Sequence, residues 1–473
     1  MSNCLLWFRK DLRLFDNPSL LKAAKYEKTF PIFIFDESLY EYNKIGSASL
    51  WWLENSLNKL KERLNNKLLI LKGDSLDLIT KLISELEIEA VFWNRCYEPD
   101  RILKDKKIKN ILINNNINVE TSNATLLWEP WKIKNKSGNF YKVFTPFYKR
   151  GCLEAASPRL ALDSPKNLTL DICEKSNFPY YQFKYFNKIN HWSIKLKKYW
   201  TTGEEEAQNR LNYFLKEGAK NYSEGRNYPS KKIVSRLSPH LHWGEISPFQ
   251  VWNKCKNEMS GNNKDTFLSE LAWREFSYYL LFHFPKINSD NLKSNFNYFK
   301  WDDNAQNIEL WQKGKTGYPI VDAGMRELWE TGYMHNRSRM VTSSFLVKNL
   351  LSHWKHGEKW FWDCLVDADL ASNSASWQWV AGTGTDAAPF FRIFNPITQA
   401  EKFDKNADYI RRFVPELAKL PNKYIFSPWT ASDTILSDAN IKLGKDYPKP
   451  VIDYQFSRNR ALETFKNLRK NSI

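Results

Sequence analysis

Three residues of the segment ELAWREF (270–276) combine charge with a flat aromatic surface. Glu270, Trp273 and Arg274 stand at positions i, i+3 and i+4, so on a helix they project from one face. A carboxylate beside a guanidinium stays ionised and accepts hydrogen bonds, and an indole ring offers a stacking plane for a nucleic-acid base. The alternative is a surface ion pair next to a core tryptophan.

The segment TGYMHNRSRM (331–340) pairs an amide with two arginines. On a helix, Asn336 and Met340 share a face because they are four residues apart, while Arg337 and Arg339 point to either side. Planar guanidinium groups bind phosphate as well as carboxylate, so one arginine could meet a nucleic-acid phosphate and the other a cofactor. An ordinary surface helix is the alternative.

The segment DADLASNSASWQW (367–379) places two acids before an asparagine and two tryptophans. Asp367 and Asp369 could accept hydrogen bonds from ring or ribose groups of a ligand, and Asn373 could bond a ring nitrogen; Trp377 and Trp379 follow. On a helix the two acids would diverge, and no histidine stands at ligand spacing among them, so we expect no metal site here. Core packing is the alternative for the tryptophans.

A fourth segment, residues 221–248, holds Tyr222, Arg226 and the turn Ser235-Arg236-Leu237-Ser238 before a predicted helix. Serine hydroxyls and backbone amides at a helix start form an anion site, so a pyrophosphate could lie there. The alternative is an ordinary serine cap. The glycine-rich stretch GTGTDAAP (382–389) lacks the Walker pattern and is predicted to be a loop.

The elements that must position these residues change type along the chain. Residues 1–125 alternate short apolar runs at 5–8, 30–35, 67–71, 90–93 and 118–121 with amphipathic stretches, which predicts a parallel, doubly wound α/β sheet without a GxGxxG fingerprint. From about residue 201 the apolar spacing turns helical. We therefore predict a Rossmann-like α/β domain (1–130), a connector (131–200) and a larger all-α domain (201–473).

The charge is concentrated in the later part of the chain. The protein has 70 Lys and Arg against 53 Asp and Glu, a net charge of +17. Residues 1–125 hold 19 basic and 17 acidic side chains, which leaves 51 against 36, or +15, on residues 126–473. This predicts a nucleic-acid face after residue 125, although general solubility would give the same excess.

Targeting and disulfide signals are missing from the sequence. The six cysteines show no metal spacing, and the start MSNCLLWFRKDLRL is too short in apolar residues for a signal peptide or a membrane span. We expect a reducing bacterial cytosol, no membrane contact and a monomer with no obligate protein partner.

Together these segments resemble the photolyase/cryptochrome family over almost the whole chain. The resemblance rests on WFRKDLRLFDNPSL (7–20), KVFTPF (142–147), SRLSPHLHWGEISP (235–248), WREF (273–276), GKTGYPIVDAGMREL (314–328), HNRSRM (335–340) and GTDAAPFFRIFNPITQAEKFD (384–404). It implies an N-terminal antenna domain and a helical domain that binds FAD beneath a DNA-facing cavity. These motifs most resemble those of the class I-like branch, which repairs cyclobutane pyrimidine dimers.

The resemblance carries over residue by residue. It implies FAD contacts at Tyr222, Val234, Ser235, Arg236, Leu237, Ser238, Phe267, Arg274, Arg339, Asp367, Ala368, Asp369 and Asn373. It implies a dimer pocket at Glu270, Trp273, Asn336, Met340 and Trp379, with Trp273 and Trp379 sandwiching the flipped bases, and DNA contacts at Arg226, Arg337, Arg392 and Gln399. Trp377, Trp354 and Trp301 fall at the positions of the family's electron relay.

Several positions separate the branches of this family. Asn373 is the repair-type residue where plant receptors usually carry an acid, and Asn336 stands where a six-four photolyase would show a second histidine. Val234 replaces a usual threonine, and Phe267 a frequent tryptophan. The stretch YEPDRILKD (97–105) lacks the Asn-Glu pair that holds folate in some members, so methenyltetrahydrofolate, a deazaflavin or no antenna all remain open.

Two other function classes compete with repair. A blue-light receptor often carries a C-terminal extension, whereas this chain stops soon after its EKFD motif. A non-catalytic DNA-binding flavoprotein would not need Glu270, Asn336, Met340 and Asn373 together. The sequence therefore favours light-driven repair, in which excited FADH⁻ donates an electron to a dimer flipped out of the duplex.

Overall fold

The computed structural model describes residues 2–40, 44–172 and 192–470, which form two compact units. The first unit contains residues 1–220 and 235–285, and the second contains 221–234 and 286–473. The predicted domain boundaries at 130 and 200 do not coincide with this division, because the connector and the first predicted helices group with the sheet. The domain assignment itself stays a prediction.

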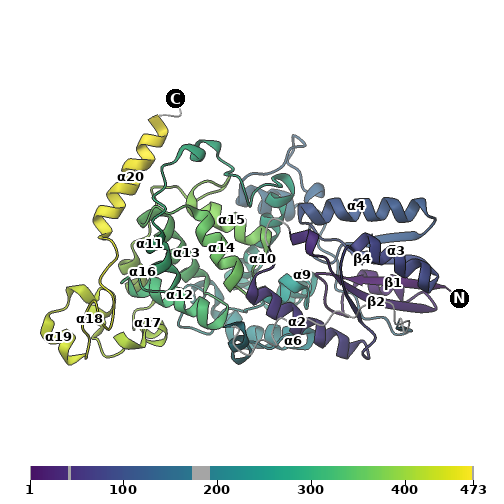
Figure 1. Ribbon diagram of the computed structural model, residues 1–473, viewed down its shortest axis with the longest axis horizontal. Coiled ribbons are helices and arrows are strands. Elements are labelled where there is room, and N and C mark those ends of the chain that lie inside the picture. The colour runs from purple at the N-terminus through teal and green to yellow at the C-terminus, as the bar shows by residue number, and fades with distance from the viewer. Residues whose placement is uncertain (1, 41–43, 173–191, 471–473) are drawn as a thin grey trace. The chain divides into compact units, whose positions relative to one another are not determined.

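A five-stranded parallel sheet lies in the first unit, in the order β3-β2-β1-β4-β5 (Figure 1). The strands are β1 (Asn3–Phe8), β2 (Lys28–Phe35), β3 (Leu69–Lys72), β4 (Ile88–Asn94) and β5 (Asn118–Ser122). The predicted parallel α/β sheet is confirmed, and only β3 begins later than its apolar run suggested. The strands of this sheet are almost continuously apolar, which is typical of a sheet that is buried on both faces.

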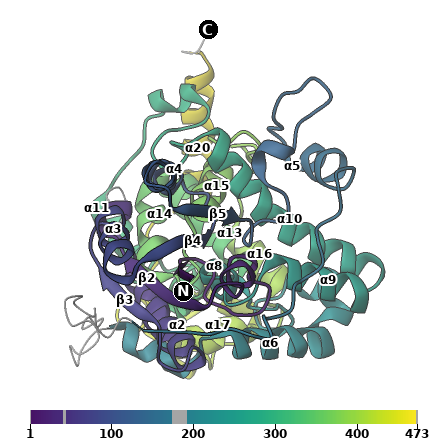
Figure 2. The same ribbon diagram turned by 90° about the vertical axis from the view of Figure 1, so that its right-hand side faces the viewer.

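Helices cover both faces of this sheet (Figure 2). The four crossover helices are α1 (Pro18–Ala23), α2 (Ser47–Arg63), α3 (Ser75–Leu86) and α4 (Pro99–Asn114). Leu5 and Trp7 of β1 share a buried cluster with Ile79 of α3 and Ile108 of α4. The neighbouring Cys4 points to the opposite face, where its Sγ lies 3.6 Å from the carbonyl oxygen of Ala23 on α1. Alternating side chains of one strand therefore serve two helical layers.

The described part of the connector has few regular elements, as predicted. It contains η2 (Pro130–Lys132), α5 (Phe144–Pro146), η3 (Phe147–Cys152) and η5 (Trp192–Lys198), and residues 173–191 lie outside the described residues. The connector runs beside the sheet, because the backbone N–H of Thr29 donates to the carbonyl of Thr169 at 2.9 Å.

The remaining helices of the first unit are η1 (Glu37–Tyr40), α6 (Glu204–Tyr213), η6 (Phe214–Gly218), η7 (Ala219–Asn221, whose last residue belongs to the second unit), α8 (Ser238–Trp243), α9 (Pro248–Glu258) and α10 (Gly261–His283). Helix α10 buries most residues after position 267, but Glu270, Trp273 and Arg274 are only partly buried. The predicted common face of these three residues is therefore the side of α10 that is not packed into the core.

The described residues of the second unit form helices and loops. Its helices are α7 (Tyr222–Gly225), η8 (Ser294–Tyr298), α11 (Ala305–Gln312), α12 (Pro319–Thr331), α13 (Asn336–Ser344), η9 (Phe345–Asn349), α14 (Trp354–Cys364), α15 (Leu370–Ala381), α16 (Pro396–Phe403), α17 (Asp408–Phe413), η10 (Pro415–Leu417), α18 (Asn422–Ile425), η11 (Pro428–Thr430), α19 (Asp433–Asp438) and α20 (Tyr454–Lys470). Helix α12 packs on α13, α16 and α17, and α14 packs on α15. Within the described ranges, no helix has the length and apolar character needed to cross a membrane.

Candidate functional site

Helix α13 separates two kinds of side chain. Asn336 begins the helix, and its Nδ2 lies 4.0 Å from the Sδ of Met340 one turn later, so the predicted pocket pair shares a face. Arg339 leaves another side, where its Nε donates to the carbonyl of Met334 at 2.7 Å. The two faces of one short helix thus present an amide with a thioether and a fixed guanidinium.

Arg339 is bound to Asp367 by two hydrogen bonds. Its Nη2 donates to Oδ1 at 3.0 Å and to Oδ2 at 2.8 Å. Asp369 caps helix α15, because its side chain accepts from the backbone N–H of Ser372 at 2.9 Å. The predicted divergence of the two acids on a helix was wrong, since α14 ends at Cys364 and both acids precede α15. Ala368 lies buried between them.

Asn373 lies in the first turn of α15 with a fixed amide. Its Nδ2 donates to the carbonyl of Glu358 on α14 at 3.1 Å, which turns the amide oxygen away from α14. The Glu358 carboxyl accepts from Ser374 at 3.2 Å, and burial raises the pKa of Glu358 to about 7. The amide oxygen of Asn373 is therefore an oriented acceptor in a largely buried position.

Positive charge gathers around the start of α13. The guanidinium of Arg337 lies 4.1 Å from the ring of Phe403, and its Nη2 donates to Asn227 Oδ1 at 2.5 Å. Arg226 lies over the ring of Tyr222 at 5.7 Å. Burial and the charges of Arg337, Arg226 and Arg339 lower the pKa of His335 to about 3, so this imidazole is neutral at physiological pH. Such a cluster suits an anion, and phosphate is the obvious one.

The glycine-rich stretch 382–389 forms a loop, as predicted, and leads to a second basic position. Arg392 and its neighbour Phe391 are both exposed. The carbonyl of Arg392 accepts from the Nζ of Lys348 at 2.9 Å, which ties this loop to the buried π-helix η9. Gln399, on α16, has its Oε1 buried without a hydrogen-bond partner among the described residues.

In the first unit, Trp273 of α10 is stacked on Phe144. The ring centroids lie 3.7 Å apart and the planes differ by 10°. One face of the indole is therefore covered within the protein. Arg274 donates to the carbonyl of Thr125 at 2.9 Å and to Glu275 at 3.0 Å, so its position is set by two partners.

The serine turn before α8 differs from a simple cap. Leu237 occupies the N-cap position, and the helix has no side-chain cap, so the alternative of an ordinary serine cap was wrong. Arg236 has a left-handed backbone (φ 54°), and its guanidinium lies 4.1 Å from the ring of Trp200. Phe267 is buried and stacks on Phe214 at 4.7 Å, whereas Val234 and Ser235 are partly buried.

The three predicted relay tryptophans lie in the second unit and are linked by close packing. Trp301 and Trp354 both contact the ring of His353, with centroid distances of 5.1 and 5.6 Å. The ring of Trp377 lies against Gly357, one turn after Trp354 on α14. Trp379, also on α15, is partly buried, and its carbonyl accepts from Ala388 at 3.1 Å.

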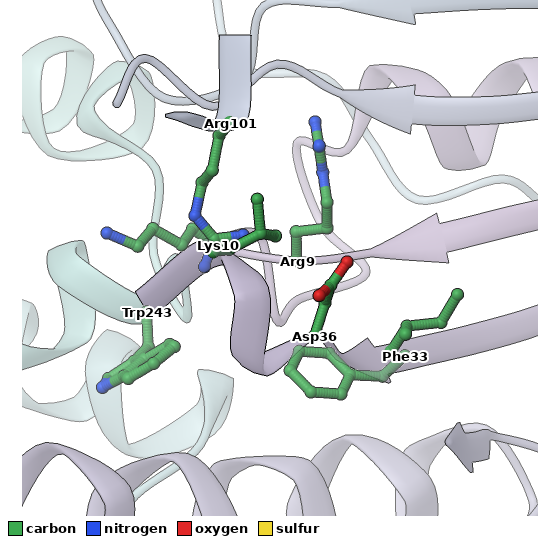
Figure 3. Close-up of a pocket in the computed structure, with 8 residues that line it drawn as sticks. Arg9, Lys10, Phe33, Asp36, Arg101 and Trp243 are labelled. Atoms are coloured by element: carbon green, nitrogen blue, oxygen red, sulfur yellow. The ribbon is translucent and has the colours of Figure 1, made fainter. Parts of the chain in front are cut away.

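A pocket lies beside the carboxyl ends of β1 and β2 (Figure 3). It is lined by Arg9, Lys10, Phe33, Ile34, Asp36, Leu39, Arg101 and Trp243. In its present form it has room for roughly one water molecule. Lys10 and Arg101 both pair with Glu98, and these side chains crowd the pocket.

Asp36 is a fixed acceptor in this pocket. Burial would raise the pKa of Asp36, but hydrogen bonds from Ser38 and Ser75 and the charge of Lys104 together hold it below its usual value. Three of the eight lining residues, Arg9, Lys10 and Arg101, are cationic and one, Asp36, is acidic, so positive side chains outnumber negative ones in this pocket.

Sequence reasoning missed this pocket, His353 and Phe144. The strand order reverses between β1 and β4, and ligands of open α/β sheets bind outside the carboxyl ends at such a switch point. Arg9 and Lys10 directly follow β1, so this rule would have pointed to them. No comparable local signal marks His353 or Phe144, because their contacts join distant segments.

Comparisons with known proteins match nearly the whole chain. Residues 4–166 match the family model described as DNA photolyase, and residues 267–467 match the FAD binding domain of DNA photolyase. The chain therefore carries the FAD-binding domain of this family. A deoxyribodipyrimidine photo-lyase of Agrobacterium fabrum is 44% identical over 99% of this chain and 98% of the relative.

Receptor-type relatives also match. Cryptochrome-2 of Arabidopsis thaliana is 35% identical over 99% of this chain and 79% of its own length. The crystal structure of a bacterial class III photolyase from Agrobacterium tumefaciens superimposes with a TM-score of 0.93 at 43% identity, covering 99% of this chain and 98% of that one. This similarity agrees with the α/β and helical architecture described above.

Proposed function

Because the chain belongs to the photolyase/cryptochrome family, we propose that it is a DNA photolyase that splits cyclobutane pyrimidine dimers with light. The observation that carries this proposal is the arrangement of α13. Asn336 and Met340 form the pair proposed to contact the dimer, while Arg339 on another side is held by Asp367. In this proposal one side of α13 meets the dimer and another side meets the cofactor.

The side chains of the second unit fit the polar edge of a flavin. Such an edge carries carbonyl oxygens and N–H groups, which match a guanidinium donor beside a carboxylate acceptor. Arg339 and Asp367 supply that combination, and the oriented amide oxygen of Asn373 supplies a further acceptor. Bound FAD, reduced and excited by light, would supply the electron that opens the cyclobutane ring.

The chain's own residues would prepare the dimer for this electron. Trp273 would stack on a flipped base with the face that Phe144 does not cover. Glu270 and Asn336 would stabilise negative charge on the dimer carbonyls, which is an electrostatic role in a site with little water. Met340 would add apolar contact, and Trp379 a second stacking surface.

The basic side chains would bind the DNA backbone. Arg226 and Arg337 flank the start of α13, and Arg392 is exposed on its loop. These arginines together would neutralise about three phosphates, so the log–log slope of affinity against salt should be roughly −3. Gln399 would add a neutral contact.

Trp301, Trp354 and Trp377 are proposed to carry an electron from the surface toward the cofactor. Trp301 is partly exposed, whereas Trp354 and Trp377 are buried, which gives the series a direction. The pocket lined by Arg9, Lys10 and Arg101 is the place we propose for an antenna chromophore with an anionic group, after Lys10 and Arg101 have moved.

The decisive experiment illuminates the reduced protein anaerobically with an oligonucleotide that carries one cyclobutane thymine dimer. Recovery of thymine absorbance in light and none in darkness is the expected result. Absence of recovery with reduced FAD bound would refute repair of cyclobutane dimers and favour a blue-light receptor. A six-four substrate would then be tested.

A variant of the pocket tests the assigned role of Glu270. Glu270→Ala should lower the quantum yield of repair while FAD stays bound, because the dimer loses a charge-stabilising partner. Asp265→Ala is the matched control, since this exposed carboxylate lies on the same helix outside the face of Glu270. An unchanged yield in Glu270→Ala contradicts the role.

A further inference from the structure

His353 is an aromatic side chain that contacts two successive members of the proposed relay, the outer Trp301 and the middle Trp354. Its ring centroid lies 5.1 Å from that of Trp301, with planes at 60°, and 5.6 Å from that of Trp354, with planes at 30°. Both distances are within the range of aromatic contact. A conjugated ring therefore touches the two groups between which an electron must move.

One hydrogen bond holds the ring of His353 and a second holds its backbone. His353 is the N-cap of α14, where its Nδ1 accepts from the backbone N–H of Lys355 at 3.1 Å. Its own backbone N–H donates to Asp303 Oδ1 at 2.7 Å. Because Nδ1 is an acceptor, the proton of the neutral imidazole is on Nε2.

Burial, together with the positive charge of its neighbours, keeps His353 neutral. Burial and the positive charge of Lys355 lower the pKa of His353, Asp303 opposes this, and His356 lowers it further, to about 4. An indole that has lost an electron is a cation, and a positive charge on the adjacent imidazole would disfavour it. The neutral ring adds no such charge.

The surroundings of Trp354 and Trp301 give these two tryptophans different roles in the proposed electron transfer. Nε1 of buried Trp354 donates to the amide oxygen of Asn291 at 2.9 Å, and an amide is not a base that could take this proton. Trp301 is partly exposed, so its indole cation can release the Nε1 proton to water. The middle indole thus stays a transient carrier, and the outer indole is the end point.

We propose that His353 is the bridge through which Trp301 passes one electron to oxidised Trp354. Trp301 is oxidised and then loses its Nε1 proton to water, Trp354 is returned to its neutral state, and the ultimate oxidant is light-excited oxidised FAD. The inference rests on the proposed relay. It goes beyond that relay by assigning a fourth, non-tryptophan member.

Capping and bridging make opposite predictions for two variants. Asparagine is a good N-cap without a conjugated ring, whereas phenylalanine keeps the ring but cannot cap. If His353 only capped α14, His353→Asn would behave as wild type. If it bridges, His353→Phe should retain fast electron transfer and His353→Asn should lose most of it.

The experiment uses the FAD-loaded protein and laser flash spectroscopy. The readout is the absorbance of the deprotonated Trp301 radical, which reports the transfer directly and does not depend on repair. His356→Asn is the matched control, because His356 lies 3.4 Å from the same Asp303. We expect the Trp301 signal in wild type, His353→Phe and His356→Asn, and its loss in His353→Asn.

The failures can be told apart. If Trp301→Phe leaves the radical signal unchanged, the relay itself is refuted. If Trp301→Phe removes the signal but His353→Asn keeps it, only the bridge is refuted, and loss of the signal in His353→Phe refutes it as well. Nitrogen NMR of the imidazole gives an independent test, since an Nδ1–H tautomer in the folded protein contradicts the geometry.

Discussion

Gly357 on α14 is a position where a single methyl group should disturb the proposed relay. A Cβ atom built on Gly357 would lie 2.0 Å from Cη2 of Trp377, and 2.5 and 2.6 Å from two neighbouring ring atoms. Ordinary contacts of this kind lie at 3.4–4 Å. The Trp377 ring is also packed against Phe361 at 4.9 Å and Trp311 at 6.3 Å, so it has no empty space to enter.

The expected free-energy change follows from two opposing effects. Replacing glycine by alanine inside a helix stabilises a protein by roughly 0.5–1 kcal/mol. Overpacking a core costs about 1–3 kcal/mol, and a rigid buried ring puts this site near the upper end. Gly357→Ala should therefore be less stable by about 2 kcal/mol, which lowers Tm by roughly 4–8 °C for a unit of this size.

Urea unfolding and photoreduction of oxidised FAD measure the two consequences. We expect lower stability and slower photoreduction in Gly357→Ala, because Trp377 must shift. Lys359→Ala is the control, since Lys359 is exposed on the same helix. If Gly357→Ala is as stable as wild type and is photoreduced at the same rate, the argument from close packing is refuted.

Three further predictions concern charge. Because the pKa of His335 is lowered to about 3 in the folded protein, the imidazole of the unfolded chain takes up a proton first as the pH falls. The free energy of unfolding of wild type should therefore fall by about 2 kcal/mol between pH 7 and 5, relative to that of His335→Asn, as measured by urea unfolding. Burial and the charge of Arg392 lower the pKa of Lys348 to about 7. The free energy of unfolding of wild type should therefore rise by about 2 kcal/mol between pH 7 and 9, relative to that of Lys348→Met, and a difference that stays constant with pH would contradict this. Arg337→Met should reduce the salt slope of binding to dimer-containing DNA by about 1 in titrations in the dark, and an unchanged slope would remove Arg337 from the DNA contacts.

Local patterns in the sequence were enough to predict the secondary structure of the sheet region. The apolar runs at 5–8 and 30–35 became β1 and β2, and the amphipathic stretch between the runs at 90–93 and 118–121 became α4. Burial of one helix face or of a whole strand leaves a periodic signature in the sequence. Spacing alone also placed Asn336 beside Met340 and turned Arg339 to another side of α13.

Tertiary structure decided the features that join distant segments. The stacking of Phe144 on Trp273, the position of His353 between Trp301 and Trp354, and the fit of Trp377 over Gly357 each depend on how separate elements pack. The position of Asp367 and Asp369 before the start of α15, and not within a helix, was likewise invisible to a periodicity argument. Periodicity records which face of an element is buried, but the partner that buries it is selected only when the chain has folded.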